Sequence, residues 1–180
     1  MTRTYHWMVV GLAVMLAPGL GCGGGGSAAD PVAEAVAQYK AAVEPPIQKS
    51  EAIAKTFVEI VLANKGNPDP DQAAQRIESE IIPRAKTFLE EVTAIQPENE
   101  KVAAIHKFLV QVAQLRLEGY TDLVKGYKEN DLDLFNQGRK KITESKIQEN
   151  AFIEQASQLM GSYGYKLEYY APPTADAVLP

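Results

Sequence analysis

Cysteine and histidine are the scarcest reactive residues in this sequence. Among 180 residues there are one cysteine, Cys22, and two histidines, of which only His106 lies beyond the first 21 residues. A single cysteine cannot form an internal disulfide, and the Cys-x-x-Cys-His motif of covalent haem is absent. Helical bundles that hold two metal ions need Glu-x-x-His on each of two helices. We therefore predict no metal site and no cofactor; a haem ligated by His106 and Met160 is the less favoured alternative.

Catalytic motifs and excess positive charge are missing as well. The sequence contains no Ser-x-x-Lys, no Gly-x-Ser-x-Gly, no glycine-rich phosphate loop and no His-Glu-x-x-His. Its formal net charge is −5 at pH 7, whereas nucleic-acid-binding proteins carry a basic surface. The densest positive run, residues 139–141, is typical of a solvated helix face. We predict that the protein is not an enzyme and does not bind nucleic acid.

Long hydrophobic runs are limited to one segment near the N-terminus. Trp7 to Ala17 are eleven residues without a charge, and a membrane-spanning helix needs about 20. Arg3 precedes this run, while Pro18 and further small residues follow it. This order is typical of a secretory signal peptide. We therefore expect residues 1–21 to be removed from an exported protein.

The cysteine follows this segment directly, in the sequence Leu20-Gly21-Cys22. This motif resembles the lipobox of bacterial lipoproteins, although Gly19 stands where the family usually has a leucine. The resemblance implies cleavage just before Cys22 and a diacylglycerol on its thiol. The alternative is cleavage after residues 27–29, Ser-Ala-Ala, which would release a soluble protein beginning at Asp30.

Four glycines follow the cysteine, and residues 22–29 are predicted to form a flexible tether. A random coil of this length reaches on the order of 15 Å. Gly23 is not the aspartate that retains lipoproteins of enteric bacteria in the inner membrane. The resemblance therefore implies an outer-membrane anchor, with the folded part facing the periplasm or the cell surface.

The first two predicted helices each contain proline. One begins at Asp30-Pro31, where aspartate is a good N-cap and proline suits the first helical position, and it ends at residues 64–66. Glu44-Pro45-Pro46 predicts a kink or short break within it. The next begins at Asp69-Pro70 and runs to Ile95, with a second kink expected at Pro83.

Two further helices are predicted in the second half of the chain. Pro97 is expected to open one, whose apolar stripe ends near Leu123. The other begins near Asn130-Asp131, and Gly161 and Gly164 mark its end. Short connections favour antiparallel neighbours.

The fold class predicted for residues 30–160 is therefore all-α, an antiparallel up-down four-helix bundle with proline kinks in its first two helices. A stack of helical hairpins ranks second because no repeat is evident. Gly119, Gly126 and Gly138 lie on or near the apolar faces. They indicate close helix approach, with a ligand cavity as the alternative.

Three polar residues lie on or beside the apolar stripes. His106 borders its stripe and is expected to be partly exposed. Arg116 and Glu149 fall on two stripes, roughly 10 Å apart along the bundle at 1.5 Å per residue. We expect no direct pair, and expect Arg116 to extend its head to solvent.

Residues 161–180 are predicted to form a non-helical tail that contains half of the tyrosines. Tyr163, Tyr165, Tyr169 and Tyr170 lie within eight residues, before Pro172-Pro173. The favoured interpretation is a strap that covers a groove between helices and binds through its hydroxyl groups. The alternative is an exposed site for docking a partner, since tyrosine is enriched in interfaces.

These observations predict a lipid-anchored protein of the cell envelope with a non-catalytic role. It would contact the membrane through a lipid on Cys22 and present a helical surface to a protein or cell-wall partner. The alternative function is a carrier of a small molecule or cofactor in a cavity of the bundle.

Overall fold

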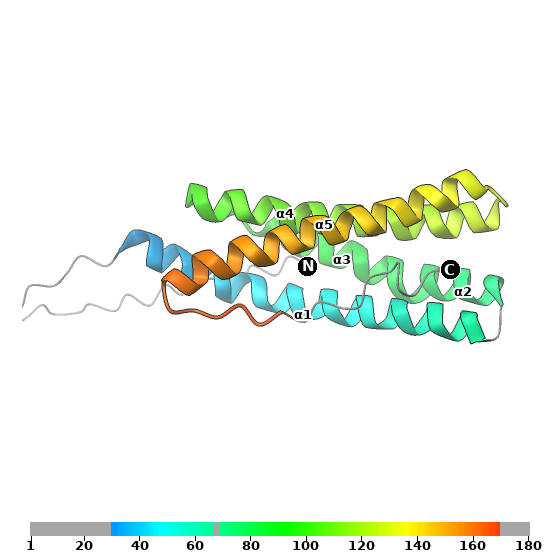
Figure 1. The fold of residues 1–180 in the computed structure, drawn as a ribbon, viewed down its shortest axis with the longest axis horizontal. Coiled ribbons are helices and arrows are strands. Elements are labelled where there is room, and N and C mark those ends of the chain that lie inside the picture. The colour runs from blue at the N-terminus through cyan, green and yellow to red at the C-terminus, as the bar shows by residue number, and fades with distance from the viewer. Residues whose placement is uncertain (1–29, 67–68, 170–180) are drawn as a thin grey trace, which may run out of the picture.

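The structure, a computed structural model, describes residues 30–66 and 69–169. This part of the chain is all-helical, with four helices that extend along one long axis (Figure 1). They are α1 (Pro31–Gly66), a continuous run of α2 (Pro70–Arg76), η1 (Ile77–Ile81) and α3 (Ile82–Ala94), α4 (Glu100–Lys128) and α5 (Leu132–Ser162). None of the described helices is long and apolar enough to cross a membrane. The predicted signal peptide, Cys22, the tether before Asp30 and Tyr170 lie outside the described residues.

Helix α1 begins as the sequence predicts. The side chain of Asp30 accepts a hydrogen bond from the backbone N–H of Val32, at 2.9 Å, and Pro31 occupies the first helical position. The helix then continues through Pro45 and Pro46 to Gly66. Of the two outcomes expected at these prolines, a kink or a short break, the break is therefore wrong. Apolar side chains on both sides of the prolines are fully buried, among them Val43 and Ile47, and this packing offsets the lost backbone hydrogen bonds.

The second helical run contains a wider π turn just before its proline. Asp69 caps α2 by accepting a hydrogen bond from the N–H of Gln72 at 3.0 Å. In η1 the N–H of Ile82 bonds to the carbonyl of Ile77, five residues earlier. The π turn directly precedes Pro83, whose ring would clash with the preceding turn of a regular α-helix.

Helix α4 begins three residues later than the sequence suggested. Its N-cap is Asn99, whose side-chain oxygen accepts hydrogen bonds from the N–H groups of Lys101 and Val102 at 3.0 and 3.3 Å. Pro97 precedes this cap instead of opening the helix. An asparagine oxygen can satisfy two free N–H groups of the first turn, which proline cannot do.

Helices α4 and α5 form the most extensive pairing in the described chain. Asn130, with φ of 53°, makes the turn between them, and Asp131 caps α5 through the N–H of Leu134. A Cβ added to Gly126 would lie 2.4 Å from the backbone nitrogen of Phe135, and one added to Gly138 would lie 2.7 Å from that of Leu123. These glycines therefore allow the backbones to touch, as the sequence indicated.

The chain leaves α5 after Ser162 and folds back along it (Figure 1). Gly164 has a φ of 77°, a left-handed conformation that glycine adopts without strain. The following residues to 169 have no regular structure. Leu167 is buried and Tyr169 packs against the core, an arrangement that agrees with the predicted strap.

Candidate functional site

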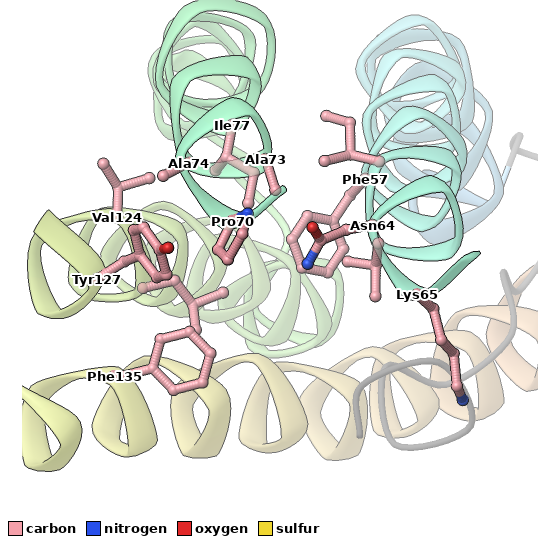
Figure 2. A pocket seen from close by; sticks show the side chains of 13 residues that line it. Phe57, Asn64, Lys65, Pro70, Ala73, Ala74, Ile77, Val124, Tyr127 and Phe135 are labelled. Carbon is pink, nitrogen blue, oxygen red and sulfur yellow. The ribbon is translucent and has the colours of Figure 1, made fainter. Parts of the chain in front are cut away.

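An apolar pocket of about 420 Å³ lies at the end of the bundle where α1 ends and α5 begins. Side chains converge on it from α1, from α2 and the start of η1, from α4 and from α5 (Figure 2). Its volume lies within the range of small-molecule pockets, about 300–1,000 Å³. The lining consists of Phe57, Ile60, Val61, Asn64, Lys65, Pro70, Ala73, Ala74, Ile77, Leu123, Val124, Tyr127 and Phe135.

The pocket changes from apolar to polar along its length. Its inner end is made by Phe57, Ile60, Ile77 and Leu123, all buried. The polar lining residues lie toward the outer end, where Lys65 is exposed and Asn64 and Tyr127 are half-buried. Along α1, residues 57 to 65 span about 12 Å at 1.5 Å per residue.

Small side chains and helix spacing explain why this space is open. Ala73 and Ala74 present only methyl groups from α2. The contacts of Gly126 and Gly138 draw α5 close to α4, whereas α1 and α5 touch at few points. The α1 side of the bundle is therefore the looser one, and large aromatic side chains reach into it without filling it.

A buried ion-pair cluster lies farther along the bundle and consists of Ser50, Arg116, Lys146, Glu149 and Tyr169. One guanidinium nitrogen of Arg116 donates to Glu149 Oε1 at 2.6 Å, and the other donates to Ser50 Oγ at 2.8 Å. Lys146 donates to Glu149 Oε2 at 2.6 Å, and the Tyr169 hydroxyl donates to Oε1. The Glu149 side chain is only 1% exposed.

The charges in this cluster stabilise one another. Burial alone would raise the pKa of Glu149, but the charge of Arg116 and the hydrogen bonds from Lys146 and Tyr169 outweigh it and hold the pKa below its usual value. Burial also opposes the charge of Arg116, yet the neighbouring carboxylate raises the pKa of its guanidinium. Burial raises the pKa of Tyr169, so its hydroxyl keeps its proton and donates. These groups are engaged with one another.

The pairing of Arg116 with Glu149 corrects the sequence-based expectation of two separate charges. Counting residues from the turn had placed the two Cα positions about 10 Å apart. Helical side chains lean toward the N-terminus of their own helix. The two helices run in opposite directions from the turn, since Gly126 faces Phe135 and Gly119, farther from the turn, faces Ile142. The side chain of Arg116 therefore leans away from the turn and that of Glu149 leans toward it, so that the two meet. Arg116 therefore ends inside the bundle and not in solvent.

His106 is also buried, whereas the sequence suggested partial exposure. It is 5% exposed and joins α1, α3 and α4 through two hydrogen bonds. Its Nε2 lies 2.9 Å from the carbonyl oxygen of Val92, and its Nδ1 lies 3.1 Å from the hydroxyl of Tyr39. A carbonyl can only accept, so Nε2 carries the proton and Nδ1 accepts from Tyr39. Burial lowers the pKa of His106, although the hydrogen bond to Val92 raises it in part.

A second, more polar groove of about 600 Å³ lies near the start of α1 and the connection between α3 and α4. Glu34, Gln38 and Tyr39 line it from α1, and residues 94–99 line it from the opposite side. The hydroxyl of Tyr39 is bound to His106. Among the described residues no group of three or more histidine, cysteine, aspartate or glutamate side chains could hold a metal ion.

The structure separates the tyrosines that the sequence grouped as a docking site. Tyr169 is half-buried, with its ring centroid 6.5 Å from that of Phe152 and its hydroxyl bound to Glu149. Tyr163 is half-buried and packs against the core. Tyr165 is 37% exposed. Of the three described tyrosines, Tyr165 is therefore the most exposed.

Comparison with family models, with curated proteins and with solved structures finds no match to this chain. The sequence indicated a cavity only as an alternative to close packing at Gly119, Gly126 and Gly138, and none of these glycines lines the apolar pocket. The pocket and the more polar groove near Tyr39 are two features that offer space to a ligand, and the pocket is the more apolar of the two.

Proposed function

We propose that this protein is a lipid-anchored, non-catalytic binding protein of the cell envelope that holds a small apolar molecule in the pocket between α1, α2, α4 and α5. The observation that carries the proposal is the pocket itself. It has a volume of about 420 Å³, and it is lined mainly by aliphatic and aromatic side chains from four helices. A dry apolar cavity of about 150 Å³ is enough to bind benzene.

The non-catalytic part of the proposal is supported by how the buried titratable groups are used. Glu149 bonds to Arg116, Lys146 and Tyr169, and His106 is held between Tyr39 and the carbonyl of Val92. A general acid or base must reach the proton of a bound substrate. In this molecule these groups are occupied in bonds that join helices.

The fold that supports this role is an antiparallel up-down four-helix bundle, kinked at Pro45-Pro46 and near Pro83. Short connections between successive helices favour this topology. The contacts of α4 with α5 support it, because Gly126 faces Phe135 near the turn and Gly119 faces Ile142 farther from it. The π turn before Pro83 is a common cause of bends.

The lipid on Cys22 and the tether of residues 22–29 would hold the start of α1 near the membrane, with an outer-membrane anchor facing the periplasm or the cell surface. The pocket would then lie roughly 40–50 Å along α1 from residue 31, at 1.5 Å per residue. The ligand would thus be presented on the side of the molecule away from the anchor.

The anchor is tested by replacing the cysteine. Cys22→Ala is expected to abolish incorporation of labelled fatty acid and to release the protein in soluble form. A mature N-terminus at Asp30, found by sequencing the protein from its host, would contradict lipidation and favour simple secretion.

The binding role is tested by native mass spectrometry of the protein extracted from its own membrane. We expect a co-purifying small molecule with the wild type, and its loss with Ala73→Phe, which fills the pocket from α2. Ala41→Phe, at an exposed alanine of α1 far from the pocket, is the matched control and should retain the molecule. The same excess mass over the polypeptide in all three proteins, or no excess mass in any of them, would contradict the proposal.

A second candidate function is the docking of a protein or cell-wall partner on the helical surface. It is favoured by Leu132 and Ile147, which are 71% and 63% exposed on α5. If this face binds a partner, the double variant Leu132→Ser, Ile147→Ser should lose a chemical cross-link that the wild type forms in whole cells. An unchanged cross-linking pattern would remove this candidate.

A further inference from the structure

The pocket is not uniform, and its polarity has a direction. Buried Phe57, Ile60, Ile77 and Leu123 close the inner end. Asn64, Lys65 and Tyr127 contribute the polar groups of the lining, and all three stand within the last turns of α1 and α4. A ligand that matches this lining has one apolar end and one polar end.

Charges at the outer end are of both signs. Lys65 is exposed, and its ammonium group points outward from the cavity (Figure 2). On the opposite side, partial burial and then the negative charges of Asp71 and Asp69 raise the pKa of Tyr127. A hydrated polar head can therefore find donors and acceptors there, whereas no charged side chain lines the inner end.

The volume of the pocket limits the size of the chain that fits. A volume of about 420 Å³ corresponds to about 14 groups the size of a water molecule, at about 30 Å³ each. The pocket runs for about 12 Å beside residues 57–65 of α1. Ile77, at the inner end, begins the π turn of η1, a feature frequently found at functional sites.

From these observations we infer that the pocket binds a single-chain amphiphile tail first, with a hydrocarbon chain of roughly a dozen carbons against the buried end and the polar head between Lys65 and Tyr127. This inference rests on the proposed function and specifies its ligand class. Rigid aromatic molecules are the competing occupants, and the experiment separates the two.

Isothermal titration with n-alkyl glucosides from hexyl to hexadecyl, each below its micelle concentration, tests the inference. Each added methylene should raise the affinity about fourfold while it enters apolar space. The increase should stop near roughly a dozen carbons, when the pocket is full. An increase that continues through hexadecyl indicates adsorption to the surface and overturns the inference, as does an affinity that does not depend on chain length.

Ala73→Phe shortens the space, so we expect its plateau two to four carbons earlier than that of the wild type, on the scale of a water-sized volume per carbon. Ala73→Leu, a smaller change, should shift the plateau in the same direction and guards against a variant that fails to fold. Ala41→Phe should keep the plateau of the wild type. An unshifted plateau in both Ala73 variants would place the chain elsewhere and overturn the inference.

Failure of this inference can be told from failure of the proposed function. If glucosides of every length fail to bind while Ala73→Phe still loses a molecule that co-purifies with the wild type, the pocket has a ligand of another class. If neither experiment shows binding at the pocket, both proposals are wrong.

Discussion

The two sides of α4 and α5 are packed by different means. Where these helices face each other, Gly119, Gly126 and Gly138 bring the backbones into contact. Toward α1 the space is wider. Long side chains and the buried ion-pair cluster fill most of it, and the pocket is the part at one end that stays open. In this molecule the close contact between α4 and α5 thus coincides with a wider space between these helices and α1.

The largest expected effect comes from breaking the ion pair that fills the wide side. Arg116→Ala leaves Glu149 buried without its main partner and should lower the free energy of unfolding by about 3–5 kcal/mol. Urea denaturation followed by circular dichroism measures this change. Arg76→Ala, which removes an exposed arginine from its pair with Glu80, is the control and should cost far less.

The double variant Arg116→Met, Glu149→Leu sharpens the same comparison. It removes both charges while keeping the volume, so most of the stability should return. A double variant as unstable as Arg116→Ala alone would show that packing, and not charge, accounts for the loss.

On the close side, added volume should be harmful. Gly126→Ala places a methyl group against the backbone of Phe135 and should destabilise the protein by about 1–3 kcal/mol, the usual cost of overpacking. Gly161→Ala, on the same pair of helices but with nothing within 4 Å, should be neutral or slightly stabilising. Thermal melting of the two variants checks the contrast, and equal melting temperatures would mean that α4 and α5 do not touch at this point.

Removing one hydroxyl from the tail should have a smaller effect. Tyr169→Phe keeps the ring against Phe152 but deletes the hydrogen bond to Glu149. The expected cost is about 1.5 kcal/mol, the lower end for a bond to a charged acceptor, because Tyr169 is only half-buried. Tyr165→Phe, at a more exposed ring, is the control. If both variants melt like the wild type, the tail does not act as a strap.

The smallest effect concerns pH. Because the pKa of folded His106 lies below 6.5, the unfolded chain binds more protons near that pH, and stability is expected to fall as the pH decreases through and below 6.5. The hydroxyl of Tyr39 and the carbonyl of Val92 face the ring, and neither supplies a negative charge. Melting temperatures at pH 7.5 and 5.5 should differ more for the wild type than for His106→Gln. An equal difference in the two proteins would assign the pH effect to other groups. Glu149 does not contribute in this range, because its pKa lies below the ordinary value of 4.5 and its protonation affects stability only below that pH.

Much of the helical pattern could be predicted because it depends on local chemistry. Asp30, Asp69 and Asp131 cap helices where the sequence indicated, since a cap is a contact within a few residues. The rules of proline were weaker guides. Pro97 does not open α4, because Asn99 can satisfy two N–H groups. Helix α1 continues through Pro45-Pro46 because the apolar residues on both sides of the prolines are buried.

The candidate site could not be predicted in the same way. Periodicity identified the stripes that contain His106, Arg116 and Glu149, but not which side chains would meet across helices. The pocket is even harder to predict from the sequence, because its walls come from positions as distant as Phe57 and Phe135. A cavity also depends on side chains that leave space unfilled, which no sequence pattern marks. The small residues Ala73 and Ala74 were the available signal, and alanine is too common in helices for that signal to be read.

The most direct test of the account is to map binding onto the chain. Heteronuclear NMR of the isotope-labelled protein, titrated with decyl glucoside, reports the backbone amides that sense the ligand. We predict saturable shifts at Phe57, Ala74, Ile77 and Leu123, at the inner end of the pocket, and weaker ones at Lys65 and Tyr127. Shifts confined to the second groove around Gln38 and Asn99, or spread over the surface without saturation, would contradict the central claim that this pocket is the binding site.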